Sequence, residues 1–302
     1  MDTWLDLHMH SHYSMDGEFE PGRLMELCAE AGLKAVALAD HNAVAGIAAA
    51  RCRAHELGLR YLSALEIDCL YAGRTFHLLG YGINETDPVF IRLEQDFHQK
   101  QRAAGHELMR KIKAQGFQFE EAQVMEHAVH GEVVAEQIAE VLLADARNAA
   151  DERLQVYRAG GSRSDNSLVN FFWDYCADGK PCCVPIDFPL FTDMAAVIKN
   201  SGGVAVLAHP GINIGSDRKL AEGLIAAGID GIEAFSNYHE DSVCRFYQAL
   251  AEAHGLIVTA GSDFHGKCKP SIHHGELPHP YPQETCERLN QLIRERGGQI
   301  LA

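Results

Sequence analysis

Features that mark several classes of protein are missing from this sequence. No run approaches the roughly 18 apolar residues that a membrane-spanning helix requires, so neither a membrane span nor a membrane partner is expected. The first residues show no basic region followed by an apolar stretch, and a cytoplasmic location is therefore the default expectation. The nine cysteines form no CxxC pair, and their odd number argues against a complete disulfide framework. The sequence assigns no role to the adjacent Cys182 and Cys183.

Basic residues are also scarce, because 26 Lys and Arg stand against 42 Asp and Glu, for a formal net charge of -16. Such a surface repels the phosphate backbone of nucleic acids, so stable nucleic-acid binding is not expected. Locally bound divalent cations would reverse the sign where an anionic substrate had to bind. With 47% hydrophobic residues in 302, the composition is that of a globular protein with room for one α/β domain and an insertion.

Short β-branched or Leu-rich runs alternate with amphipathic helical patterns, which is typical of βα units and a parallel sheet. Seven strands are predicted, at 4–7, 34–39, 61–67, 75–81, 204–208, 231–235 and 257–260. Helices are predicted at 21–31, 43–57, 218–227, 240–254 and 283–296. The pattern predicts an α/β fold with its site at the carboxyl ends of the strands.

The alternation stops between residues 87 and 192, where the pattern is almost wholly helical. Helices are predicted at 87–115, ended by Gly116, and at 120–144. We interpret residues 87–192 as a helical insertion or cap. The remaining domain is then discontinuous and consists of residues 1–86 and 193–302.

Potential metal ligands lie at or just after the predicted strands. They are His8, His10, Asp40, His41, Glu66, His77, His209, Asp263 and His265. Two positions separate His8 from His10, which places both side chains on the same side of an extended segment. Imidazole and carboxylate donors without thiolates favour Zn, Mn or Fe. Any one of the 17 histidines could be placed by chance, but ligand-type residues directly after five of seven strands are not readily produced by chance.

These residues occur in motifs that resemble a known family. His8-Met9-His10-Ser11 with Ser14 and Asp16, then Ala39-Asp40-His41, is similar to the opening of the PHP (polymerase and histidinol phosphatase) superfamily. Glu66, His77, Ala208-His209-Pro210 and Gly261-Ser262-Asp263-Phe264-His265 complete the resemblance in family order. The resemblance covers the chain apart from the insertion and implies a distorted seven-stranded β/α barrel, in agreement with the strand count.

The resemblance also implies three divalent metal positions. Their ligands would be His8, His10, Glu66 and Asp263 for the first, Glu66, His77 and His209 for the second, and Asp16, His41 and His265 for the third. Glu66 would bridge two ions, and Asp40 would orient a ligand. The implied reaction is attack of a metal-bridging hydroxide on phosphorus, since metal lowers the pKa of bound water from about 15.7 towards roughly 7.

Other residues are candidates for protonating the leaving group or binding substrate. His12, His239 and a water at the third position are the candidate proton donors. His239 follows the sixth predicted strand, which places it on the face of the site, and the alternative role is to cap the next helix. Lys267 and Lys269 could bind a substrate phosphate, and Arg102 could do so from the insertion if the insertion covers the site.

The leading function is therefore a metal-dependent phosphoesterase for a small phosphorylated metabolite. Two substrates remain open: a nucleoside mono- or 3′,5′-bisphosphate, and a cyclic phosphate of a phosphorylated ribose. The alternatives are a histidinol-phosphate phosphatase, an exonuclease, an amidohydrolase on the same metals, and a non-enzymatic metal-binding barrel. The complete ligand set argues against the last, and the acidic net charge argues against an exonuclease.

Overall fold

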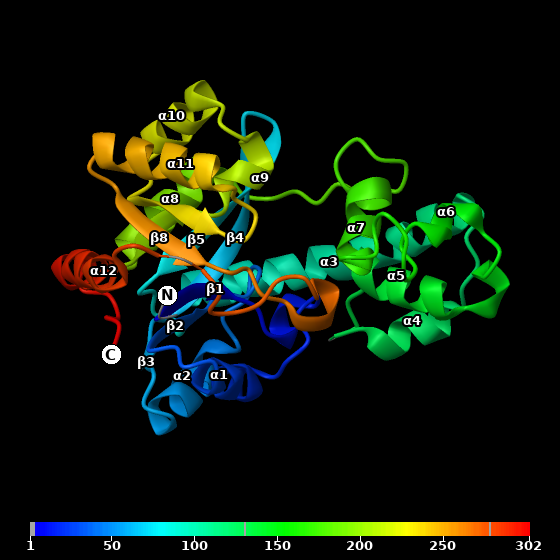
Figure 1. Cartoon of the computed structure of the whole chain (residues 1–302), viewed down its shortest axis with the longest axis horizontal. Coiled ribbons are helices and arrows are strands. Elements are labelled where there is room, and N and C mark those ends of the chain that lie inside the picture. The colour runs from blue at the N-terminus through cyan, green and yellow to red at the C-terminus, as the bar shows by residue number, and fades with distance from the viewer. Residues whose placement is uncertain (1–3, 130, 278) are drawn as a thin grey trace.

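The computed structural model describes residues 4–129, 131–277 and 279–302, which form a mixed α/β fold with a helical extension on one side (Figure 1). The strands in the described residues are β1 (Leu5–Met9), β2 (Ala35–Leu38), β3 (Arg60–Tyr61), β4 (Ala64–Tyr71), β5 (Arg74–Tyr81), β6 (Val204–Leu207), β7 (Gly231–Ser236) and β8 (Ile257–Gly261). All seven predicted strands are present. The third is divided into β3 and β4.

The strands form two sheets. The first has the order β1-β2-β3 and the second β4-β5-β6-β7-β8. Single bridges join them at two places, between Met9 and Phe264 and between His41 and Glu66. The mixed α/β class is confirmed, and a closed seven-stranded barrel stays a prediction.

The expectation of an all-parallel sheet is wrong for β5, which runs antiparallel to both β4 and β6. The cause is the two-residue turn Ala72-Gly73, in which both residues have positive φ, 49° and 76°. Two residues with positive φ make a tight hairpin, whereas a parallel crossover needs a dozen or more residues.

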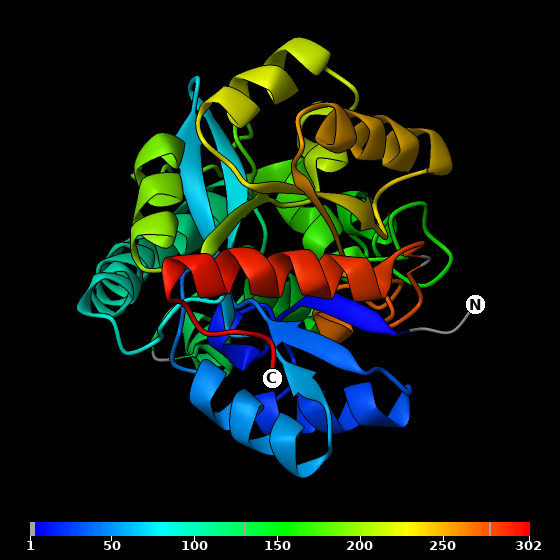
Figure 2. The same ribbon diagram turned by 90° about the vertical axis from the view of Figure 1, so that its left-hand side faces the viewer.

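Helices cover the outer faces of both sheets. Those of the β-containing part are α1 (Pro21–Glu30), α2 (Ile47–Glu56), α8 (Phe191–Asn200), α9 (Pro210–Ile214), α10 (Arg218–Ala226), α11 (Asp241–Ala253) and α12 (Pro282–Arg296). α1 begins at Pro21, whose fixed φ and missing N–H suit the first turn of a helix. In Figure 2, α12 lies across the gap between the two sheets. None of the described helices is long and apolar enough to cross a membrane.

The helical extension contains most of the predicted insertion. Its helices are α3 (Pro88–Ala114), α4 (Glu121–His127), α5 (Ala135–Ala144), α6 (Glu152–Gln155) and α7 (Ser167–Phe171). α3 begins where it was predicted, since the Asp87 carboxylate accepts a hydrogen bond from the N–H of Val89 at 2.9 Å. The single helix predicted at 120–144 is instead α4 and α5, separated by a connection in which Gly131 has φ 76°.

Two hydrophobic cores correspond to these two parts. The larger lies between the sheets and their helices, and it includes Phe90 and Phe191 near the two ends of the insertion. The smaller lies among α3, α4, α5 and α7. Cys182 belongs to the smaller core, whereas Cys183 is half-buried. One member of the smaller core, Cys268, comes from the segment after β8. The boundaries at residues 87 and 192 stay a prediction.

Candidate metal centre

Four buried side chains meet at the ends of β1 and β8 and near the start of β4. The expectation that Glu66 closes its strand is wrong, because β4 continues to Tyr71. His8, His10, Glu66 and Asp263 offer nitrogen or oxygen atoms that all lie within 4.8 Å of one another. His8 Nε2 is 3.2 Å from Glu66 Oε2, and His10 Nε2 is 2.9 Å from Asp263 Oδ1. The structure thus brings together the four residues predicted for the first metal position.

The backbone explains why these side chains converge. The N–H of Asp263 donates to the carbonyl of His8 at 2.8 Å, and the N–H of His10 donates to the carbonyl of Phe264 at 2.9 Å. The segment after β8 therefore continues beside β1. Gly261 permits this approach, because a Cβ there would lie 2.1 Å from the Cβ of His8.

A second group forms around the other oxygen of Glu66. Oε1 lies 3.0 Å from His77 Nδ1 and 3.1 Å from His209 Nε2. Oε2 also faces His41, whose Nδ1 is 3.0 Å away. The residues predicted for the second position therefore surround Glu66, and His41 joins them.

The third predicted group lies beside the first. His10, His41 and His265 offer nitrogen atoms within 4.8 Å of one another. Asp16 Oδ2 is 3.2 Å from His265 Nε2. Since His10 and His41 also belong to the other groups, the three positions form one continuous cluster.

The donor atoms of this cluster fit divalent metal ions. Most are buried and make no hydrogen bond among the described residues: His8 Nε2, His10 Nε2, Asp16 Oδ1, His41 Nδ1, Glu66 Oε2, Asp263 Oδ1 and His265 Nε2. Buried polar atoms are normally satisfied, so this concentration of unsatisfied atoms indicates a missing partner. Imidazole and carboxylate donors suit a borderline or hard cation.

The pKa values in the cluster shift in different directions for its carboxylates and its histidines. Burial alone would raise the pKa of Glu66, but His8, His41 and His77 hold it well below its usual value. Lys269 and His265 likewise hold the pKa of Asp263 low against the effect of burial. Burial and the neighbouring His265 and His41 lower the pKa of His10 well below its usual value. Against the effect of burial, Glu66 raises the pKa of His8 and raises that of His77 to about 9. Because imidazole binds metal in its neutral form, metal binding to these two histidines would release protons.

Glu233 on β7 is a residue of this site that the sequence prediction missed. It is fully buried, with Oε1 3.1 Å from Nδ1 of His8 and Oε2 accepting the N–H of His209 at 2.9 Å. A carboxylate on the far nitrogen of a histidine fixes its ring orientation and raises its basicity as a ligand. The sequence contained a signal for Glu233, because it is a charged residue within a strand that is otherwise apolar or small, Gly231–Ser236.

Asp68 on β4 was missed as well. Its Oδ1 lies 3.1 Å from Nε2 of His77, on the opposite side of that ring from Glu66. Asn42 holds Asp68 in place, donating to its Oδ2 at 2.7 Å and accepting its N–H at 3.0 Å. The signal was its position two residues after Glu66, which places both side chains on one face of the strand.

Asp40 lies behind the cluster. It accepts hydrogen bonds from the Ser11 N–H at 2.6 Å and from the Ser14 hydroxyl at 2.8 Å. The same hydroxyl is 2.9 Å from His10 Nδ1. Burial raises the pKa of Asp40 to about 6. This chain of contacts is consistent with the predicted role of orienting a ligand.

The two candidate proton donors lie outside the three groups. The Gly211 N–H donates to Nε2 of His239 at 2.9 Å, so its Nδ1 is the protonated nitrogen, 2.9 Å from the carbonyl of Ala234. Both nitrogens are thus used by the backbone, which favours the structural alternative for His239 over proton donation. His12 Nδ1 lies 3.4 Å from Glu20.

The three predicted substrate-binding cations have different surroundings. Lys269 lies partly buried at the cluster, with Nζ 2.6 Å from Asp263 Oδ2 and 5.5 Å from the centre of the Tyr238 ring. Lys267 instead pairs with Glu140 on α5 at 2.7 Å and is half-exposed. Arg102 pairs with Glu132 in the insertion at 2.8 Å. Only Lys269 of these three contacts a residue of the cluster.

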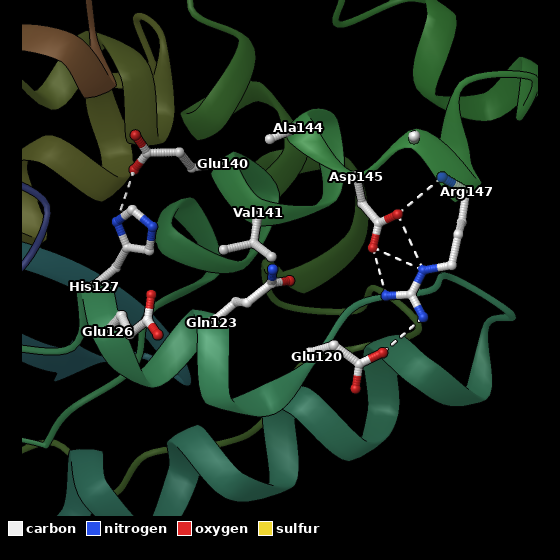
Figure 3. A pocket seen from close by; sticks show the side chains of 10 residues that line it. Glu120, Gln123, Glu126, His127, Glu140, Val141, Ala144, Asp145 and Arg147 are labelled. Carbon is white, nitrogen blue, oxygen red and sulfur yellow. Dashed lines mark hydrogen bonds and ion pairs between the residues drawn. The ribbon is translucent and has the colours of Figure 1, made fainter.

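A cavity of about 640 Å³ opens between α4 and α5, away from the cluster (Figure 3). Three of its four carboxylates have cationic partners, since Glu140 pairs with Lys267 and both Glu120 and Asp145 pair with Arg147. None of its lining residues is a predicted ligand.

Comparisons with known proteins agree with this geometry. The chain is 29% identical to a 3′,5′-nucleoside bisphosphate phosphatase of Chromobacterium violaceum, with 86% of this chain and 87% of the relative covered. It is 28% identical to a phosphoribosyl 1,2-cyclic phosphate 1,2-diphosphodiesterase of Eggerthella lenta, covering 91% and 96%. It is also 29% identical to the 5′-3′ exoribonuclease Rnm of Escherichia coli, covering 87% and 85%.

A solved structure described as an amidohydrolase from Chromobacterium violaceum superposes with a TM-score of 0.77 at 26% identity, covering 94% of this chain and 96% of that one. A model of the PHP domain matches residues 6–158, just over half of the 302 residues. The resemblance noted in the sequence is therefore confirmed, and the chain belongs to the PHP domain family.

Proposed function

We propose that this metal-dependent phosphoesterase of the PHP family acts on a small phosphorylated metabolite. The proposed substrate is a nucleoside mono- or 3′,5′-bisphosphate, or a cyclic phosphate of a phosphorylated ribose. The relatives from C. violaceum and E. lenta are named for substrates of these classes. The fold similarity supports the distorted seven-stranded barrel as its scaffold.

The observation that carries the proposal is the position of Glu66. Its two oxygens face five imidazoles at 3.0–3.4 Å: His8, His10, His41, His77 and His209. A carboxylate so placed is suited to bridge two cations. We propose three divalent ions, each Mn, Zn or Fe. They would supply Lewis acidity toward phosphoryl oxygens and increase the acidity of water.

The protein's own residues then have distinct proposed roles. The nine ligands are His8, His10, Asp16, His41, Glu66, His77, His209, Asp263 and His265. Glu233, Asp68 and Asp40 orient His8, His77 and, through Ser14, His10. Lys269 is the proposed contact for a substrate phosphate, because its ammonium group lies at the edge of the cluster beside Asp263 and is partly exposed.

The test is phosphate release by protein purified with Mn²⁺. The panel contains nucleoside mono- and bisphosphates, ribose cyclic phosphates, histidinol phosphate and other sugar phosphates, with Glu66→Ala as the matched control. We expect release from one of the first two groups and none from the control. A metal-loaded protein that releases phosphate from no compound would reject the proposal.

Exoribonuclease activity is the second candidate, because the E. coli relative carries that name. A short 5′-phosphorylated oligoribonucleotide added to the same panel separates the two. The net charge of -16 predicts weak binding of long strands, so we expect slower turnover of the oligonucleotide than of the mononucleotide substrates.

A further inference from the structure

Tyr238, in the turn after β7, contacts two of the proposed metal ligands. Its hydroxyl donates a hydrogen bond to Oδ2 of Asp263 at 2.5 Å. Its ring meets the ring of His209 nearly at right angles, with the ring centres 5.7 Å apart. Asp263 is a proposed ligand of the first ion and His209 of the second. One aromatic side chain, which the sequence prediction missed, therefore links the two metal positions.

The two oxygens of Asp263 have different surroundings. Oδ1 faces other proposed ligands, 2.9 Å from His10 Nε2 and 3.5 Å from His8 Nε2, and makes no hydrogen bond among the described residues. Oδ2 instead accepts from the Tyr238 hydroxyl and from Lys269 Nζ, which is 2.6 Å away. A carboxylate that is held by two donors on one oxygen presents only its other oxygen to an ion.

The two ligands that Tyr238 contacts both have strained backbones. Among the nine proposed ligands, all of which the structure describes, only Asp263 and His209 have positive φ, 59° and 23°. Positive φ is uncommon for residues other than Gly, and such conformations persist where the surrounding structure holds them. Tyr238 thus lies against the two ligands whose conformations most require support from neighbouring residues.

Lys269 is less suited than Tyr238 to fix Asp263. An ammonium group on a flexible four-carbon chain has many rotamers, whereas a tyrosine ring has only two side-chain torsions. Lys269 is also the proposed contact for a substrate phosphate. If its ammonium group turned toward that phosphate, the Tyr238 hydroxyl would remain as the donor to Oδ2. Because the hydroxyl is neutral, it orients the carboxylate without placing a repelling positive charge beside the ion.

We propose that Tyr238 is a positioning residue of the metal centre, which holds Asp263 with Oδ1 toward the first ion and supports His209 at the second. A hydrogen-bonded group behind a metal ligand fixes the orientation of that ligand. Glu233 on β7 supports His8 and His209 in the same way. β7 and the turn after it would then support both positions without supplying a ligand. This inference deepens the proposed function and rests on it, because it concerns the same metal site.

The test is Mn²⁺ binding by metal-free protein, measured by equilibrium dialysis and elemental analysis for the wild type, Tyr238→Phe and Tyr157→Phe. Tyr238→Phe keeps the ring against His209 and removes only the hydroxyl. We expect one bound ion to lose about tenfold in affinity, with the other ions unchanged. This is the low end for loss of a supporting group, because Lys269 still bonds Asp263.

Tyr157→Phe is the matched control. The Tyr157 hydroxyl also donates to an aspartate that has a cationic partner, since it is 2.7 Å from Asp174 Oδ2 and Arg163 pairs with Asp174. All three residues belong to the helical extension, and none is a proposed metal ligand. The Mn²⁺ affinity of this variant should match the wild type even if its stability falls.

Thermal unfolding separates a positioning role from a purely structural one. An ion bound tenfold more weakly would stabilise the folded protein by about 1.4 kcal/mol less at the same excess of Mn²⁺. The increase in unfolding temperature on adding Mn²⁺ should therefore be smaller for Tyr238→Phe than for the wild type and Tyr157→Phe. If Tyr238→Phe were less stable without metal but gained as much from Mn²⁺ as the wild type, Tyr238 would be a structural residue and the inference would be overturned.

The two proposals fail separately, because metal binding is measured without a phosphate ester. Equal Mn²⁺ affinity in Tyr238→Phe and the wild type would overturn the role of Tyr238 and leave the phosphoesterase untouched. Full metal binding without phosphate release would reject the proposed substrates, while the same titrations still decide the role of Tyr238.

Discussion

The first and third of the proposed metal positions are built in different ways. The first is fixed by the sheets: its four residues are at most 3% exposed, and backbone hydrogen bonds hold β1 to the segment after β8. The third depends on loops that the insertion holds, through Gln137 on Met15, Glu140 on Lys267 and the burial of Cys268 in the insertion core. The comparison suggests that the sheets fix the core of the site and the insertion adjusts its edge.

Replacing Glu66 with Ala should have the largest effect, because both of the first two positions would lose their shared ligand. Removal of several kcal/mol of charge stabilisation corresponds to a loss in kcat on the order of 10³-fold or more. Phosphate release and bound metal per chain would be measured together. Retention of both at wild-type levels would contradict the role of Glu66.

Glu233→Gln tests the first metal position, which the sheets fix, without removing one of its proposed ligands. The amide would present an N–H₂ group toward either His8 or the His209 N–H, where a carboxylate oxygen now accepts. We expect metal affinity to fall about 10–100-fold. The loss should be confined to the ions held by His8 and His209, and a uniform loss at all positions would point to misfolding.

Asp68→Asn should have a smaller effect, since Asp68 is partly exposed and supports one ligand, His77. We expect about a tenfold weaker second metal ion, at the low end for a supporting carboxylate. Activity titrated against Mn²⁺ gives the measurement. The matched substitution Asp193→Asn, in the first turn of α8, should leave the curve unchanged.

Gln137→Ala tests the third metal position, whose loop is held by the helical extension. It leaves the carbonyl of Met15 and the N–H of Val134 without their partner, at a cost of about 1–3 kcal/mol if water does not replace it. We expect a few-fold loss in affinity for the third ion only. If the first ion weakened equally, the two halves of the site would not be separable in the way we describe.

Replacing His98, on α3, should have the smallest effect, and the effect is on the stability of the protein rather than on metal binding. Glu132 and Glu94 raise the pKa of His98 to about 9. A raised pKa means that the stabilisation is complete below about pH 6.5 and is lost as the pH rises through about 9. After solvent screening we expect about 1 kcal/mol. The stability difference between wild type and His98→Gln should shrink from pH 6 to pH 10, and a constant difference would contradict this assignment.

The sequence predicted most members of the cluster because strand ends and two-residue spacing are local patterns. His8, His10 and Asp263 lie at or just after the ends of their strands, whereas Glu66 lies near the start of β4. Glu233 and Asp68 were missed because their partners are distant in sequence: Glu233 contacts a histidine 225 positions away. The sequence could not show that both ring nitrogens of His239 contact the backbone, because these contacts are with Gly211 and Ala234 and no sequence pattern reveals them.

The fold was predictable to the same extent. Strand positions were recovered, since most of the strands are mainly buried and apolar, as in β2 and β6. The direction of β5 was not, because it depends on two residues, Ala72 and Gly73, whose positive φ values make a hairpin. The division of the predicted 120–144 helix likewise follows from a local turn containing Gly131 that helix propensity alone does not show.

The burial of Cys268 in the insertion core bears on how such proteins diverge and can be recombined. A chimera that exchanges residues 87–192 between two relatives also exchanges the socket that receives residue 268. Unless residue 268 is exchanged together with residues 87–192, the new segment would pack against a side chain that its own core did not evolve to hold, close to Asp263 and His265. Compatibility between the exchanged segment and the rest of the chain would then depend on residue 268 as well as on the contacts of Gln137 with Met15 and of Glu140 with Lys267.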